Sequence, residues 1–337
     1  MAGTQNAPLR VLVSTPDPAK FDPARWPVTT PVDWRAASPV TPGEFARELP
    51  GADVAITTLF TPEMGSAADQ LRAIFVPAAG YENIDPDAVP PGCAVTNAYE
   101  HEAPITEWIF MVASAMDREF LKAERTFRAG SWEMWPVRHG SYRELHGRTM
   151  GVVGFGRIGQ KVAQVADAFG MPCIAAGRKP DAPGAAAKLN ATYHGGPGAI
   201  SEVMRQADFV VVSTPLNDST RGLIGENELA VMKPTAYLIN PARGHVVDER
   251  ALYDALKTHR IAGAAVDTWY QYPSGPDDDP RPAGLPFWEL DNVIMTPHNS
   301  GATVGTSRLR AKLVAENIDR LSRGEPLLNV VDGLSRA

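Results

Sequence analysis

The chain has 337 residues, of which 44% are hydrophobic, and its formal net charge is −7. This length suffices for about two domains, each with a hydrophobic core. The acidic balance argues against a nucleic-acid partner, because phosphate binding normally depends on a surplus of lysine and arginine. No stretch approaches the roughly 18 apolar residues of a membrane span, so we expect no membrane partner and, by default, a cytoplasmic protein.

Two cysteines, Cys93 and Cys173, are too few for a disulfide framework. Each lies in an apolar stretch, so we interpret both as reduced packing residues. The N-terminal segment lacks a charged region that leads into a long apolar run, and its short apolar segment therefore indicates a first strand rather than a signal peptide.

The N-terminal third alternates short apolar runs with helical or loop segments, which predicts a parallel sheet. Expected strands cover residues 9–15, 52–58, 71–77 and 93–97, with a short helix at 41–51. Proline and glycine crowd residues 16–43 and predict an irregular surface segment there. A helical pattern follows from Pro104 to Ala129, and residues 130–147 indicate a loop rich in aromatic and polar side chains.

From Thr149 onward, strands and helices alternate regularly, as in a doubly wound α/β domain. The expected strands are 149–156, 172–177, 208–214, 236–242, 261–267 and 292–298, and the expected helices are 158–170, 200–206, 226–232 and 248–260. Residues 307–324 predict a last helix that could return to pack on the N-terminal domain, and residues 273–282 predict a polar loop.

A glycine fingerprint follows the first strand of this second region and opens a helix. Gly154, Gly156 and Gly159 form GxGxxG, in which the glycines allow a tight turn, a close approach of the backbone to a pyrophosphate, and close helix–strand packing. The start of the helix offers free N–H groups to the phosphates. The alternative is a glycine-rich turn in a Rossmann-like domain that binds no nucleotide.

The tip of the next strand bears on the choice of cofactor. A site that prefers NAD usually places Asp or Glu there to bind the ribose 2′-hydroxyl, but here Gly177 is followed by Arg178 and Lys179. Two cations can bind a 2′-phosphate. We therefore predict NADP(H) as the preferred cofactor and NAD(H) as the second; the alternative is that both cations are merely solvated.

Three later segments carry residues suited to redox chemistry. Arg243 follows one predicted strand and can grip a carboxylate with two hydrogen bonds. His298 ends another strand, and an imidazole can pass a proton at neutral pH. Asp267 lies between them in the sequence. Each could be structural when taken alone, but together they follow a dinucleotide fingerprint.

At this point the sequence resembles the D-isomer-specific 2-hydroxyacid dehydrogenase family, from about Phe75 to the end of the chain. The resemblance is carried by PAAGYENID (77–85), ITE (105–107), GFGRIG (154–159), TPLNDSTRGLI (214–224), NPARGHVVDE (240–249), AGAAVDTWYQYP (262–273) and PHNSGAT (297–303). Several specific motifs occur in the family's order.

The resemblance implies two α/β domains, Rossmann-like or flavodoxin-like, with parallel sheets and an active-site cleft between them. The substrate domain would be discontinuous, with residues 1–102 and 303–337, and the dinucleotide-binding domain would cover residues 103–302. The resemblance also implies a homodimer joined largely through the nucleotide domain, and a small 2-oxo or 2-hydroxy acid as the substrate. No metal is implied.

The resemblance further implies the roles of individual residues. Arg243 would orient the substrate, and His298 would protonate the carbonyl oxygen as hydride arrives. The loop at Ala78, Ala79, Gly80 and Tyr81 would bind the carboxylate through backbone N–H groups. Cofactor contacts would come from the fingerprint with Arg157 and Ile158, from Thr214 and Pro215, and from Asp267 near the nicotinamide.

One departure from the family pattern concerns the catalytic histidine. The glutamate that usually pairs with it is replaced by Tyr272, which supplies no negative charge at neutral pH but can orient the ring. The related formate dehydrogenases also lack this glutamate and need no proton transfer. His101 stands where those enzymes place a substrate-contacting asparagine, which makes it either a substrate contact or a loop histidine.

The leading hypothesis is therefore an NADP(H)-linked reductase of small 2-oxo acids such as glyoxylate or hydroxypyruvate. A formate-dehydrogenase-like hydride donor is the second hypothesis. The third is a dinucleotide-sensing binding protein without catalysis, which the pair of Arg243 and His298 disfavours.

Overall fold

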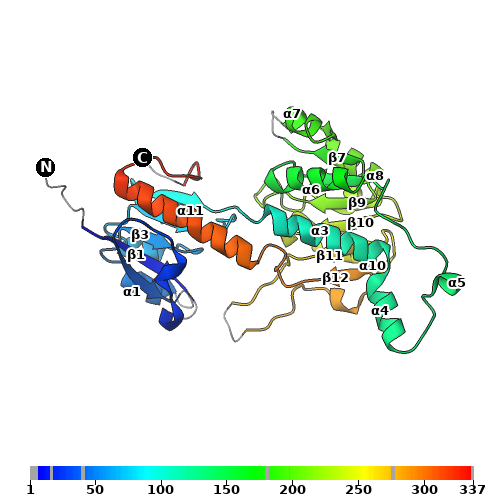
Figure 1. Cartoon of the computed structure of the whole chain (residues 1–337), viewed down its shortest axis with the longest axis horizontal. Coiled ribbons are helices and arrows are strands. Elements are labelled where there is room, and N and C mark those ends of the chain that lie inside the picture. Colours follow the sequence, from blue (N-terminus) through cyan, green and yellow to red (C-terminus); the bar gives the residue numbers. More distant parts are fainter. Residues whose placement is uncertain are drawn as a thin grey trace. The chain divides into compact units, whose positions relative to one another are not determined.

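The computed structural model describes residues 7–15, 18–38, 42–178, 182–196, 198–274 and 278–334. The chain divides into two compact units (Figure 1). The first unit combines Met1–Glu100 with Val304–Ala337, and the second unit is His101–Thr303. The polar loop expected at 273–282 falls only partly within the described residues.

The first unit is built on a parallel sheet of five strands in the order β2-β1-β3-β4-β5, the flavodoxin-like order. Its strands are β1 (Leu9–Ser14), β2 (Val32–Ala37), β3 (Val54–Ile56), β4 (Ala73–Val76) and β5 (Ala94–Asn97). Its helices are α1 (Pro42–Glu48), α2 (Pro62–Ala67) and α11 (Val304–Arg323), with single 3-10 turns at Pro18–Lys20 and Pro23–Arg25. The parallel sheet and the returning C-terminal helix are as predicted.

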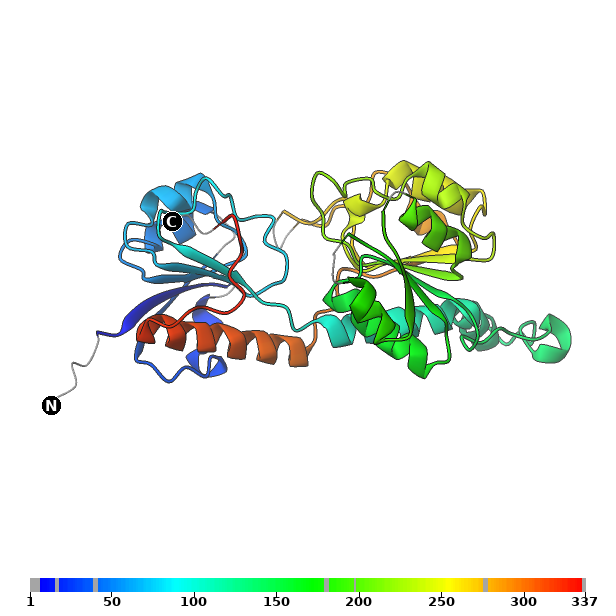
Figure 2. The ribbon, with the colours of Figure 1, turned by 90° about the horizontal axis from the view of Figure 1, so that it is seen from above.

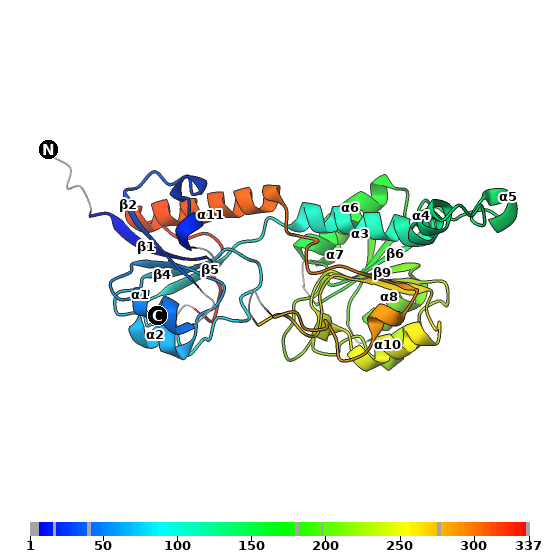
Figure 3. The same ribbon diagram turned by 90° about the horizontal axis from the view of Figure 1, so that it is seen from below.

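Alternate strand residues of the first unit face opposite helices. Val11 and Ile56 pack with Val314 and Ile318 of α11, whereas Leu12 and its neighbours pack with α1 and α2. Figure 3 shows α11 on one face of the sheet and α1 and α2 on the other. Because side chains of a strand alternate between faces, both faces of this sheet are buried in apolar cores.

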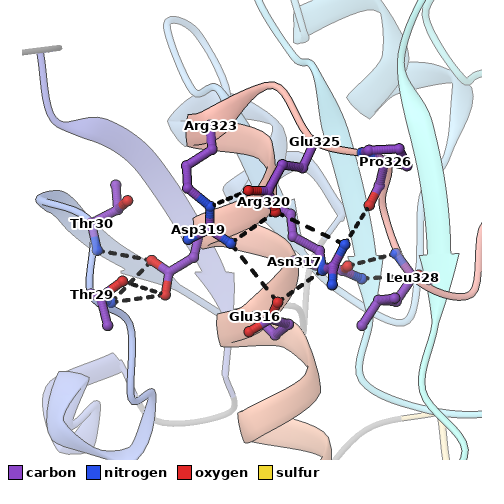
Figure 4. A network of polar contacts seen from close by, with 10 residues as sticks. All are labelled: Thr29, Thr30, Glu316, Asn317, Asp319, Arg320, Arg323, Glu325, Pro326 and Leu328. Carbon is purple, nitrogen blue, oxygen red and sulfur yellow. Dashed lines mark hydrogen bonds and ion pairs between the residues drawn. The ribbon is translucent and has the colours of Figure 1, made fainter.

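Polar contacts fasten α11 to the rest of its unit (Figure 4). The buried carboxylate of Asp319 accepts hydrogen bonds from the backbone N–H groups of Thr29 (3.0 Å) and Thr30 (2.8 Å) and from the Thr29 hydroxyl (2.8 Å). Asn317 donates to the Leu328 carbonyl (3.0 Å) and accepts from the Leu328 N–H (2.8 Å). These contacts anchor both the segment before β2 and the chain that follows α11.

The second unit has a parallel sheet of seven strands in the order β12-β11-β10-β9-β6-β7-β8. Its strands are β6 (Met150–Val153), β7 (Cys173–Ala176), β8 (Ala191–His194), β9 (Phe209–Val212), β10 (Tyr237–Asn240), β11 (Gly263–Val266) and β12 (Val293–Met295). Its helices are α3 (Glu102–Asp117), α4 (Phe120–Arg128), α5 (Pro136–His139), α6 (Arg157–Ala168), α7 (Ala182–Ala187), α8 (Ala199–Gln206), α9 (Glu226–Ala230) and α10 (Glu249–Lys257), with single 3-10 turns at Gly244–Val246 and Phe287–Glu289.

The order of the second sheet fixes where its loops meet. The chain runs outward from β6 through β7 and β8 on one side, and through β9, β10, β11 and β12 on the other. Helices α3 and α6 cover one face, and α8, α9 and α10 cover the other, as the ribbon in Figure 2 shows. Such a sheet binds ligands at the carboxyl ends of its strands, near the point where the strand order reverses.

Several local predictions were wrong. Residues 16–43 are not wholly irregular, because they contain the strand β2, which pairs in parallel with β1 through Leu9 and Val32. The helix expected from Pro104 to Ala129 is broken into α3 and α4 at Glu119, whose φ is +48°. The expected loop at 130–147 contains the single turn α5, and α2, α7 and β8 were not predicted.

Cys93 and Cys173 are free and buried, as predicted. Burial raises the pKa of each thiol to about 12, so both stay protonated and unreactive at neutral pH. In the described residues no helix is both long and apolar enough to cross a membrane.

Candidate active site

The glycine fingerprint forms a tight turn between β6 and α6. Gly154 has φ +100°, and a Cβ at this residue would lie 2.6 Å from Oγ1 of Thr214. A Cβ at Gly159 would lie 2.3 Å from the carbonyl oxygen of Gly154. Side chains are thus excluded at Gly154 by conformation and packing, and at Gly159 by packing.

Gly156, in contrast, faces open space. A Cβ there would meet no atom of the described residues within 4 Å, and Gly156 immediately precedes the first residue of α6. Open space beside the free N–H groups of a helix start fits a dinucleotide pyrophosphate. Of the two fingerprint residues that follow, Arg157 pairs with Glu102 (3.9 Å), whereas Ile158 packs against the core that α3 and α6 share.

Arg178 lies at the tip of β7, the strand next to β6 in the sheet. Its Nη1 donates to the hydroxyl of Ser219, which belongs to the loop after β9 (3.2 Å). Ser219 was not among the predicted site residues, although the polar run 217–220 of its motif is visible in the sequence. Lys179 lies outside the described residues.

Thr214 and Pro215 begin the loop after β9. The Thr214 hydroxyl donates to the carbonyl of Val153 at the end of β6 (3.0 Å), and the Pro215 carbonyl accepts from the Thr220 hydroxyl (2.6 Å). Both predicted residues therefore lie at the edge of the sheet where the fingerprint turn lies.

Arg243 follows β10 in an extended conformation. Its Nη1 donates to the carbonyl of Ala242 (2.7 Å). Asn240, buried at the end of β10, donates to the Arg243 carbonyl (3.1 Å) and accepts from the Ala242 N–H (3.1 Å). Asn240 thus fixes the backbone that carries the guanidinium.

Asp267 follows β11 and is completely buried, with 0% of its surface exposed. Its carboxylate accepts from the backbone N–H groups of Asn299 and Ser300 (3.0 Å each) and from the hydroxyls of Thr296 and Ser300. Its side chain therefore organises the loop around His298, a role that the sequence analysis missed. A contact of Asp267 with the nicotinamide stays a prediction.

His298 follows β12 and is exposed to solvent. Its φ is +55°, in the left-handed region that residues other than glycine seldom occupy. Hydrogen bonds hold this backbone, because the His298 N–H donates to the Asp267 carbonyl (2.8 Å) and the next two N–H groups bind the Asp267 carboxylate.

Tyr272 lies beside His298, with ring centroids 5.6 Å apart and planes inclined by 57°. The Tyr272 hydroxyl accepts from the backbone N–H of Trp269 (3.0 Å). The phenol ring therefore lies next to the imidazole, as the sequence predicts, while its hydroxyl oxygen accepts a hydrogen bond from the main chain.

His101 starts the second unit and precedes α3. A Cβ at Gly301 would lie 3.4 Å from the Cβ of His101, so this histidine packs against the loop that carries His298. The structure thus brings together three segments of the second unit, which carry His101, the pair Asp267 and Tyr272, and His298.

Ala79, Gly80 and Tyr81 follow β4 of the first unit. Asn97 fixes their backbone by donating to the Ala79 carbonyl (2.8 Å). Among the backbone–backbone hydrogen bonds of the described residues, none is donated by the N–H groups of these three residues. Backbone amides in a turn of this kind suit a carboxylate. The described residues also contain no group of three or more His, Cys, Asp or Glu side chains that could hold a metal ion.

Comparison with known proteins agrees with this arrangement. Residues 110–300 match the family described as D-isomer specific 2-hydroxyacid dehydrogenase, NAD binding domain. A glyoxylate reductase of Korarchaeum cryptofilum is 35% identical over 308 residues, which cover 89% of this chain and 88% of that protein.

Solved structures share the fold. An acyclic imino acid reductase in complex with NADPH and D-Arg superimposes with a TM-score of 0.76 at 26% identity, covering 95% of this chain and 99% of that one. A D-mandelate dehydrogenase of Rhodotorula graminis gives a TM-score of 0.80 at 24% identity, covering 97% and 98%. The chain belongs to the D-isomer-specific 2-hydroxyacid dehydrogenase family and is an oxidoreductase with an NAD(P)-binding domain.

Proposed function

We propose that the protein reduces small 2-oxo acids, such as glyoxylate or hydroxypyruvate, to D-2-hydroxy acids with NADPH. The observation that carries this proposal is the placement of Arg243, Asp267 and His298 after the adjacent strands β10, β11 and β12. An anion-binding group and a proton donor then share one edge of the sheet with the dinucleotide fingerprint. The similarity to glyoxylate reductases supports the substrate class.

In this proposal each residue has one task. The Arg243 guanidinium binds the substrate carboxylate and carbonyl, and the exposed imidazole of His298 gives its proton to the carbonyl oxygen. Bound reduced nicotinamide supplies hydride to the carbonyl carbon. Asp267 holds the backbone of the His298 loop in its left-handed conformation, so the main chain that carries the imidazole is fixed before substrate binds.

The amides of Ala79, Gly80 and Tyr81 are proposed to bind the substrate carboxylate, and His101 is proposed to contact the substrate. For the cofactor, Gly154, Gly156 and the start of α6 hold the pyrophosphate, and Arg178 binds the 2′-phosphate. Two observations support NADPH: position 177 is Gly where a site that prefers NAD usually has Asp or Glu, and the imino acid reductase with the same fold was solved with NADPH.

A steady-state panel tests the proposal. Purified protein is assayed with glyoxylate, hydroxypyruvate and pyruvate, each with NADPH and with NADH, and separately with formate plus NADP⁺ or NAD⁺. We expect the highest kcat/KM for a 2-oxo acid with NADPH. Turnover of formate alone would favour the formate-dehydrogenase-like alternative, and tight cofactor binding without any turnover would favour a sensing protein.

We also propose that the protein is a homodimer joined through the arm formed by residues 120–137. Figure 1 shows α4 and α5 extending away from the body of the second unit. This arm bears a cluster of large apolar side chains, each exposed by 46% or more: Phe120, Leu121, Phe127, Trp132, Trp135 and Val137. Clustered exposed aromatics of this kind are typical of protein interfaces.

Sedimentation velocity tests the dimer. We expect the wild type to sediment as a dimer and Phe127→Glu to sediment as a monomer, since a buried glutamate would have to lose its hydration. Glu124→Gln on the same helix removes a charge without adding one and serves as the matched control. A monomeric wild type would refute the arm as an interface.

A further inference from the structure

The contact between Arg178 and Ser219 links the loops after β7 and β9 across strand β6. Arg178 follows β7 and Ser219 lies in the loop after β9, and these strands flank β6 on either side. The fingerprint glycines continue directly from β6. The guanidinium is therefore held at the same sheet edge as the fingerprint turn, instead of extending freely into solvent.

Asn217 determines whether the Ser219 hydroxyl donates or accepts toward Arg178. The Ser219 hydroxyl donates to Oδ1 of Asn217 (2.6 Å), and the same oxygen accepts from the Ser219 backbone N–H (3.0 Å). A serine hydroxyl has one proton to donate and two lone pairs that accept. Because its proton is committed to Asn217, Ser219 presents lone pairs to Nη1 of Arg178 (3.2 Å).

The loop that carries Ser219 is itself fixed. The buried Thr220 accepts from the Asn217 N–H (2.8 Å) and donates to the Pro215 carbonyl (2.6 Å). Pro215 directly follows Thr214, whose hydroxyl is bonded to the end of β6 (3.0 Å). A continuous series of contacts thus runs from the fingerprint strand to the Arg178 guanidinium.

We propose that Ser219 is a positioning residue that selects the orientation of Arg178 in which the guanidinium binds the cofactor 2′-phosphate. The inference rests on the proposed preference for NADP(H). Arginine loses considerable side-chain entropy when it is immobilised, and an exposed arginine that is already oriented loses less on binding. Ser219 therefore acts through Arg178, and its effect is confined to ligands that carry a 2′-phosphate.

Binding calorimetry separates this role from a general effect on the loop. The probes are adenosine 2′,5′-bisphosphate, which carries the 2′-phosphate, and ADP, which lacks it. The variants are Ser219→Ala, Ser219→Thr and Arg178→Ala, with Ser66→Ala as a matched control on the first unit. Thermal melting of each variant verifies that the fold is retained.

We expect Ser219→Ala to weaken adenosine 2′,5′-bisphosphate about 3- to 10-fold, the size of one ordinary hydrogen bond, without changing ADP affinity. Ser219→Thr keeps the hydroxyl and is expected to restore wild-type affinity. Arg178→Ala is expected to weaken the bisphosphate more than Ser219→Ala does, and Ser66→Ala is expected to change neither ligand.

The outcomes distinguish the two proposals. If Arg178→Ala weakens the bisphosphate and Ser219→Ala does not, the positioning role is refuted and the cofactor assignment stands. If Arg178→Ala leaves the bisphosphate unaffected, the cofactor assignment fails, and the role of Ser219 fails with it. Equal weakening of both ligands by Ser219→Ala would also refute the positioning role, because it would show a structural effect on the whole loop.

Discussion

Reversal of the cofactor preference is the sharpest test of the dinucleotide site. The perturbation replaces Arg178 by Ala and Gly177 by Asp, which removes one of the two cations and installs a carboxylate that can bind the ribose 2′-hydroxyl. One charge-assisted hydrogen bond to a phosphate contributes about 1.5–3 kcal/mol. The loss of such a contact corresponds to a decrease of roughly 10- to 150-fold in kcat/KM with NADPH.

The structure indicates that this pair of substitutions is not enough to produce good turnover with NADH. A Cβ at Gly177 would lie 3.0 Å from the hydroxyl oxygen of Tyr193 and 3.5 Å from the backbone nitrogen of Phe155. The first distance is too short, so Tyr193 has to move before any side chain is accommodated at this position. Replacing Tyr193 by Phe removes the oxygen and keeps the ring that packs edge-on against Phe155 (6.0 Å between centroids).

The double and triple variants are therefore expected to differ in their activity with NADH. The double variant should lose activity with NADPH and gain little with NADH, and the addition of Tyr193→Phe should raise kcat/KM with NADH. Steady-state kinetics with the best 2-oxo acid at saturation measures both cofactors, and Tyr193→Phe alone is the control. Equal or better turnover of the wild type with NADH would refute the reasoning about the β7 tip.

Three further predictions concern catalysis and stability. His298→Ala should lower kcat for 2-oxo acid reduction about 10²- to 10⁴-fold. Arg243→Ala should mainly raise KM for the 2-oxo acid, because it removes the group that binds the carboxylate. Kinetics close to wild type in either variant would show that the site is misplaced. Tyr272→Glu should shift to higher pH the point at which the rate of 2-oxo acid reduction falls on the alkaline side, because a carboxylate beside an imidazole favours its protonated form. An unshifted pH dependence of this rate would count against the pairing of residue 272 with His298. Burial raises the pKa of Asp319, but hydrogen bonds from neighbouring threonines outweigh it and leave this pKa below its usual value. Asp319→Asn should therefore lower the free energy of unfolding by about 1–3 kcal/mol at neutral pH. The difference in unfolding free energy between wild type and variant should shrink below about pH 4, because the carboxylate of the unfolded chain is then protonated. At still lower pH the carboxylate of the folded protein is protonated as well. Urea unfolding at several pH values measures this difference, and Asp33→Asn is the control at an exposed position.

The regular elements could be predicted wherever an apolar run was bounded by glycine or polar residues. Strand β9 is the clearest case, because its four residues are all buried and bring Val210 and Phe209 to opposite faces. Strand β2 lacks this signal. It lies at the edge of its sheet, most of its residues are only partly buried, and prolines precede it in the sequence. Its pairing with β1 depends on tertiary structure rather than on local pattern.

Two helical errors have different causes. Helix α2 has a readable start, because Thr61 accepts from the Met64 N–H and Pro62 occupies the first turn, but its six residues are too few to show a period. The break after α3 has no local signal, since the residues around Glu119 are good helix formers. It follows Asp117, which is buried and paired with Arg148 from a distant segment. Only the folded chain contains that constraint.

The residues of the candidate site could be proposed from the sequence because their chemistry selects their types. The contacts that hold these residues in place could not be predicted. Asp267 lies 33 positions before Ser300, and no periodicity links the two. In the fold they meet because β11 and β12 are adjacent parallel strands, and the turns that follow such strands lie at one edge. The Asp267 carboxylate then accepts N–H groups that the left-handed turn at His298 would otherwise leave unpaired. The aspartate thus offsets part of the cost of this left-handed turn, which is why a residue with no exposed surface is included in the proposed active site.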